Sequence, residues 1–145
     1  MINERYLVPA YGPDVEALQI ALQALEIVGT KLNGEVAIVV PALKHADSTV
    51  LNKVIPENQL KSLIKGGSLT LGESKIPLSL VSQKTLNNTK ASVLLAVFAS
   101  AKMIEKIESS ASCEALIVLP WAGEVDVEKW KKKCTPTILD LNEKT

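Results

Sequence analysis

The residues best suited to contact a ligand lie in turns that follow apolar runs of the sequence. They combine hydroxyl, ammonium, imidazole and aromatic groups with two glycines, and they are Tyr11, Gly12, His45, Ser100, Lys102, Trp121 and Gly123. Glycine lets a backbone approach a ligand closely. The set predicts a binding site for a small polar ligand, with a mononucleotide as one candidate. A structural role is the alternative, because turns favour glycine.

Ser100 and Lys102 form the part of this set that suits an anion. They provide a hydroxyl and a cation at the start of an expected helix, where free backbone amides attract phosphate. Ser100 also suits an ordinary helix N-cap. The phosphate-binding motifs G-x-x-x-x-G-K-[ST] and G-x-G-x-x-G do not occur in the sequence. No cofactor is therefore predicted.

Hydrolysis is a weaker alternative. Ser100 has alanine on both sides, unlike the G-x-S-x-G of a hydrolase nucleophile, and no spacing brings His45 to it. Carboxylates can hold Mg²⁺ beside a phosphate ester, and all four aspartates fall on or just after the end of an expected strand: Asp14, Asp47, Asp126 and Asp140. The first three also suit helix caps. A magnesium-assisted hydrolase built on the last three is thus a third hypothesis, and no metal ligand is assigned.

Charge and composition exclude several classes of partner. Sixteen basic residues balance 16 acidic ones, so the positive field typical of nucleic-acid binders is missing. No apolar stretch approaches the roughly 18 residues of a membrane span, and the first residues lack the pattern of an export signal. We expect a cytoplasmic protein without nucleic-acid or membrane partners. Cys113 and Cys134 are then expected to be reduced thiols.

The elements that must position these residues are apolar runs alternating with helical segments. The runs are rich in β-branched residues and continuous rather than alternating, which is typical of strands buried on both faces of a parallel sheet. They are 6–10, 36–41, 93–99, 115–119 and 137–140. The expected fold is a single α/β domain over 1–145, a three-layer, doubly wound, Rossmann/flavodoxin-like fold with a mostly parallel five-stranded sheet.

Helical periodicity is expected between these runs. A segment from Pro13 to Val28, ended by Gly29, has a single narrow polar stripe. Such a helix needs cover on more than one face, either from another helix or from a second subunit, and we expect a homo-oligomer. The second hypothesis for function is a homo-oligomeric protein-interaction module without a small-molecule site, in which this helix and the segment 67–81 form the subunit interface. The other expected helices are 47–53, 56–65, 102–109 and 125–133. In the last of these, Trp130 is expected to pack inward and its neighbouring lysines to face solvent.

Two further features complete the expected fold. Residues 67–81 alternate around a turn and predict a β-hairpin inserted into the domain, with Pro77 on an edge strand or in a partly paired one. The run 93–99 could instead belong to one helix over 89–108, because alanine and leucine favour helices; we prefer the strand. The preferred order of the five runs is 2-1-3-4-5, which places the ligand site between the first and third strands.

Overall fold

A computed structural model of the chain describes residues 4–8, 15–40, 55–65, 69–71, 76–82, 91–110, 113–120 and 124–138. Within these ranges the strands are β1 (Glu4–Leu7), β2 (Val36–Val40), β3 (Leu69–Leu71), β4 (Ile76–Ser82), β5 (Val93–Ala99), β6 (Ala115–Pro120) and β7 (Thr137–Ile138). The helices are α1 (Val15–Leu32), α3 (Glu57–Ile64), α4 (Ala101–Ser110) and α5 (Glu124–Cys134).

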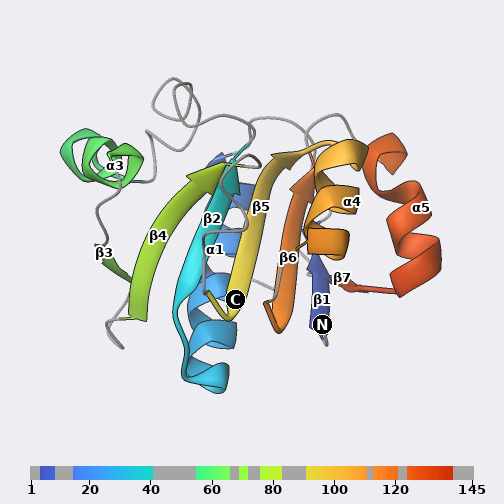
Figure 1. Cartoon of the computed structure of the whole chain (residues 1–145), viewed down its shortest axis with the longest axis horizontal. Helices are drawn as coiled ribbons and strands as arrows, with labels where there is room; N and C mark the ends of the chain where they lie inside the picture. The colour runs from blue at the N-terminus through green and yellow to red at the C-terminus, as the bar shows by residue number, and fades with distance from the viewer. Residues whose placement is uncertain are drawn as a thin grey trace.

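The strands form one sheet in the order β3-β4-β2-β5-β6-β1-β7 (Figure 1). Six strands run parallel, and β3 pairs antiparallel with β4 at one edge. The central strands β2 and β5 are buried along their whole length, because helices cover both faces. This is the α/β, Rossmann/flavodoxin-like architecture predicted from the sequence, with six parallel strands instead of five.

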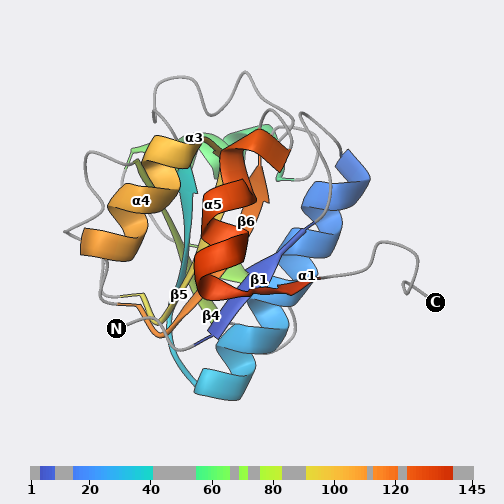
Figure 2. The same cartoon turned by 90° about the vertical axis from the view of Figure 1, so that its right-hand side faces the viewer.

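Each face of the sheet has its own apolar core. Alternate residues of β2 and β5, such as Ile38 and Leu95, pack with α1 and α3. The residues between them, such as Val39 and Leu94, pack with α4 and α5 on the opposite face. Figure 2 shows the sheet nearly edge-on, with α1 on one side and α4 on the other. The three-layer arrangement thus follows from runs in which every position is apolar.

The predicted strand order 2-1-3-4-5 is wrong. β1 lies between β6 and β7, so the five predicted runs stand in the order 2-3-4-1-5. Tyr6 pairs with Ile117 on one side and with Thr137 on the other. The connection through α1 crosses over β6 and β5, which this helix contacts, before the chain enters β2. An 18-residue helix spans about 27 Å, which is long enough for such a crossing.

The other expectations hold to different extents. Residues 93–99 form a strand, and the alternative single helix over 89–108 is excluded. The predicted hairpin is present, but β4 continues the main sheet beside β2 and is not an edge strand. Its pairing with β2 starts at Leu78, so Pro77 takes no part in that ladder. The expected helix 47–53 lies outside the described residues.

The first helix ends later than predicted. Gly29 lies inside α1, and the cap is Asn33, which has a φ of 52°. The amide of Asn33 donates to the Thr30 carbonyl, and that of Gly34 donates to the Gly29 carbonyl, as in a Schellman motif. A Cβ on Gly29 would lie 2.6 Å from Cγ1 of Val36. Gly29 is therefore needed for close helix–sheet packing rather than for the cap.

Candidate functional site

In the observed strand order, the connections switch from one side of the sheet to the other at a different place from the predicted one. From β2 the chain leads through α3 to β4 on one side, and from β5 it leads through α4 to β6 on the other. α3 and α4 pack on opposite faces. Ligands of open α/β sheets bind outside the carboxyl ends of the strands at such a switch. The switch therefore lies between β2 and β5, and the predicted position between β1 and β5 is wrong because β6 separates those strands.

The carboxyl end of β5 carries a backbone irregularity. Val97 pairs with Leu119 and Ala99 with Pro120, so the register shifts by one residue in a β-bulge. Phe98, inside this bulge, has a φ of 54°. A bulky residue in the left-handed region is an outlier, with a cost of about 1–3 kcal/mol. The bulge also changes side-chain alternation: Val97 and Phe98 both pack in the α1 face core.

Two of the predicted site residues follow directly after this bulge. Ser100 Oγ accepts a hydrogen bond from the Met103 amide at 3.3 Å, which confirms the N-cap interpretation. Lys102 is exposed in the first turn of α4. Among the described residues, no partner is found for the backbone amides of Ala101 and Lys102. The start of α4 therefore has free donors at the carboxyl edge of the sheet.

The remaining predicted site residues lie outside the described part of the chain: Tyr11, Gly12, His45, Trp121 and Gly123. Their positions in the sequence still relate them to strands. His45 comes after β2, the neighbour of β5, whereas Tyr11 and Gly12 come after β1, which is not its neighbour. The role of these five residues stays a prediction.

The aspartate hypothesis finds no support in the described ranges. Asp14, Asp47 and Asp140 are not described, and neither is the side chain of Asp126. No group of three acidic, cysteine or histidine side chains suitable for a metal ion occurs among the residues that are described.

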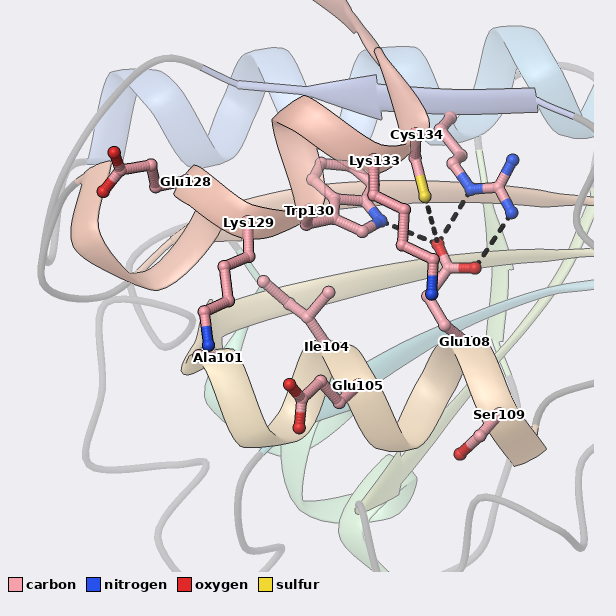
Figure 3. Close-up of a pocket in the computed structure, with 11 residues that line it drawn as sticks. Ala101, Ile104, Glu105, Glu108, Ser109, Glu128, Lys129, Trp130, Lys133 and Cys134 are labelled. Atoms are coloured by element: carbon pink, nitrogen blue, oxygen red, sulfur yellow. Dashed lines mark hydrogen bonds and ion pairs between the residues drawn. The ribbon is translucent and has the colours of Figure 1, made fainter.

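A pocket that the sequence did not predict lies between α4 and α5. It has a volume of about 800 Å³, and side chains of both helices line it (Figure 3). Ile104 and Trp130 provide an apolar floor, and both side chains are otherwise buried in the core under these helices. Glu105 of α4 and Lys129 and Lys133 of α5 also line it. We call this space the α4–α5 pocket.

Glu108 connects the residues at one end of the α4–α5 pocket by hydrogen bonds. Its carboxylate accepts hydrogen bonds from Arg5 Nε at 2.8 Å, from Arg5 Nη2 at 2.9 Å and from the Trp130 indole at 2.7 Å (Figure 3). The Cys134 thiol lies 3.9 Å away. Helices α4 and α5 are thereby joined to β1 through one carboxylate. Bidentate contact with arginine is among the stronger charge-assisted interactions.

Burial and hydrogen bonding act in opposite directions on Glu108. Burial by itself raises the pKa of this carboxyl, but the hydrogen bonds from Arg5 and Trp130 outweigh it and hold the pKa below its ordinary value. The same contact raises the pKa of the Arg5 guanidinium further. Both groups are therefore charged at neutral pH, and the carboxylate is already occupied by its partners.

The two cysteines are free thiols, as predicted. Burial raises the pKa of the Cys113 thiol to about 11, which makes it a poor nucleophile near neutral pH. Trp130 packs inward in the core while Lys129, Lys132 and Lys133 are exposed, as the sequence indicated.

Only two residues of the sequence give any indication of the α4–α5 pocket. Glu108 follows Ile104 by four residues and therefore shares its buried helix face. Arg5 likewise interrupts the start of a strand, on the same face of the sheet as Leu7. A charged residue in each of two apolar faces could have suggested a buried ion pair. Nothing in the spacing relates two residues that are 103 positions apart.

Comparison with known proteins gives no assignment. No protein-family model matches the sequence, and no curated protein matches it significantly. None of the helices in the described ranges is both long and apolar enough to cross a membrane.

Proposed function

We propose that the protein binds a small polar ligand with an anionic group, such as a mononucleotide, at the carboxyl edge of the sheet between β2 and β5. The observation that carries the proposal is the bulge at Phe98. The left-handed backbone of Phe98 costs conformational free energy. The bulge lies at the end of β5, beside the point between β2 and β5 at which the strand connections switch to opposite sides of the sheet. Bulges of this kind are over-represented beside binding and active sites, where they redirect the residues that follow.

The chemistry next to the bulge suits an anion. The free amides of Ala101 and Lys102 lie at the positive end of the α4 dipole. The exposed ammonium group of Lys102 adds a charge in the same turn. Ser100 is already used as the cap, so its hydroxyl orients the helix rather than reacting. The proposal is accordingly one of binding and assigns no reaction.

Thermal unfolding with added ligand tests this proposal. Nucleoside monophosphates and inorganic phosphate are added to the wild type and to Lys102→Ala. A ligand present at 100 times its Kd stabilises the native state by about 2.7 kcal/mol. We expect a higher Tm for the wild type with at least one nucleotide and a much smaller shift for Lys102→Ala. Lys106→Ala is the matched control, since Lys106 is exposed one turn later on the same helix.

Two results would overturn the proposal. One is an unchanged Tm with every nucleotide at about millimolar concentration, where even weak sites fill. The other is a shift that Lys102→Ala retains in full, because the ligand would then bind elsewhere.

Self-association is a second candidate, favoured by one residue. Ile27 on α1 is 68% exposed, and among the described elements none of the other helices covers the outer face of α1. A second copy of the chain would bury this side chain. Sedimentation at two concentrations tests the idea: we expect a dimer that Ile27→Glu dissociates, and a monomer at every concentration would rule it out.

A further inference from the structure

The charged residues that α4 contributes to the α4–α5 pocket are carboxylates, whereas α5 contributes two lysines and Glu128. Glu105 projects from α4, and Lys129 and Lys133 project from α5 into the same space (Figure 3). All three side chains are exposed. The ion pairs found among the described residues join Arg5 to Glu108, Lys31 to Glu4 and Lys132 to Glu128, so none of the three is paired there. Glu128 also lines the pocket but is paired with Lys132, and the charge of Lys133 helps to lower the pKa of Glu108. The pocket therefore offers a ligand Glu105 on one wall and Lys129 and Lys133 on the other.

The floor of the pocket is apolar and fixed in place. The Trp130 ring is only 6% exposed, and its indole nitrogen is held by Glu108. Ile104 is buried beside it in the same core cluster. Because Glu108 already accepts hydrogen bonds from Arg5 and Trp130, it has little capacity left for a ligand. A surface that is fixed before binding loses little entropy when a ligand arrives.

We propose that the α4–α5 pocket binds a free amino acid with an apolar side chain. The ammonium group of the ligand faces Glu105, its carboxylate faces Lys129 and Lys133, and its side chain covers Trp130 and Ile104. The pocket volume, about 800 Å³, lies within the range of small-molecule sites. This site is separate from the one under Proposed function and does not depend on it.

The arrangement of charges selects this class over its simpler relatives. A carboxylic acid without an amine would leave Glu105 facing a like charge or losing water without compensation. An amine without a carboxylate would do the same to the two lysines. A neutral apolar molecule would cover all three charged groups. Only a zwitterion with an apolar body satisfies both walls and the floor.

A direct ion pair between Glu105 and a lysine across the pocket is the competing arrangement. Exposed pairs of this kind are worth about 0.2–1 kcal/mol, so a ligand that makes two charged contacts can displace one. The experiment must therefore separate a ligand site from a pocket that closes on itself.

Isothermal titration calorimetry with matched probes makes this separation. The probes are L-phenylalanine, L-leucine, 3-phenylpropionate, which lacks the amine, and phenethylamine, which lacks the carboxylate. We expect both amino acids to bind, and each single-charge analogue to bind at least about tenfold more weakly than phenylalanine. Glu105→Gln should weaken phenylalanine binding without weakening phenylpropionate binding. Lys129→Met should weaken phenylalanine binding without weakening phenethylamine binding.

Two control variants keep the test specific. Lys132→Met removes a lysine that does not line the pocket and that pairs with Glu128, and Lys102→Ala removes the cation of the other proposed site. Both should bind phenylalanine as the wild type does. The proposal fails if neither amino acid binds at up to about 10 mM, if phenylpropionate binds as tightly as phenylalanine, or if Lys132→Met weakens binding as much as Lys129→Met.

Discussion

Replacing Glu108 by glutamine should destabilise the fold by about 2 kcal/mol. The change keeps the size of the side chain but removes its charge. Three hydrogen bonds, two from Arg5 and one from Trp130, then lose their charge-assisted character, at about 1 kcal/mol each. The side chains of Arg5 and Glu108 remain 23% and 22% exposed, so water recovers part of this loss. The expected fall in Tm is about 4–8 °C.

The pH dependence of this difference is a second readout. The pKa of Glu108 is lowered in the folded state. Its contribution to stability is therefore complete above the unfolded carboxyl pKa of about 4.3. It is lost as the pH falls through the lower folded pKa. The stability gap between wild type and Glu108→Gln should be constant near pH 7 and should shrink below about pH 4.

Urea unfolding followed by circular dichroism measures both effects. Glu105→Gln is the control, because this exposed carboxylate lies one turn earlier on α4 and has no ion pair among the described residues. Glu105→Gln should change the free energy of unfolding by no more than about 0.5 kcal/mol. Equal destabilisation by the two variants would refute the reasoning. A gap that keeps its full size at about pH 2, where an ordinary carboxyl is protonated, would also refute it.

Two further substitutions and one labelling experiment test the packing and the backbone. Gly29→Ala should lower the urea midpoint by an amount equivalent to about 1–2 kcal/mol, because its methyl group would meet Val36 at 2.6 Å; an unchanged midpoint would show that the sheet yields easily. Thr135 has a φ of 43° at the end of α5, so Thr135→Gly should stabilise by about 0.5–1 kcal/mol, and a lower Tm would contradict this. The native protein should react with a thiol reagent quickly at Cys134 and slowly at Cys113, whose pKa is raised to about 11 by burial; equal rates would argue against that burial.

The central strands could be predicted because their sequence leaves few alternatives. β2 and β5 are apolar at every position, and only a strand covered on both faces buries all of them. The same argument fails at β1, which includes Glu4 and Arg5. Their charges are satisfied by Lys31 and Glu108, and local periodicity contains no trace of such distant partners.

Strand order was beyond the reach of sequence reasoning for a related reason. Consecutive strands are neighbours in about two-thirds of cases, so the default places β1 beside β2. Here α1 crosses two strands instead. Its apolar residues, including Leu18 and Leu25, fit the surface of β5 and β6, but leucine and alanine pack equally well on any apolar strand. Because the strand order differs from the prediction, the candidate ligand site lies between β2 and β5 and not between β1 and β5. Ser100 and Lys102 follow β5, as predicted.

The position of β1 sets the sequence of events during synthesis on the ribosome. Its partner residues in the sheet are 115–118 and 137–138, so this strand is synthesised long before either of its neighbours and stays unpaired until they follow. Contacts between such distant segments slow folding, and an unpaired strand edge is open to aggregation or to chaperones. A rearranged gene that places β1 after β6, with a crossover linker of at least about a dozen residues because the two strands are parallel, would remove the delay.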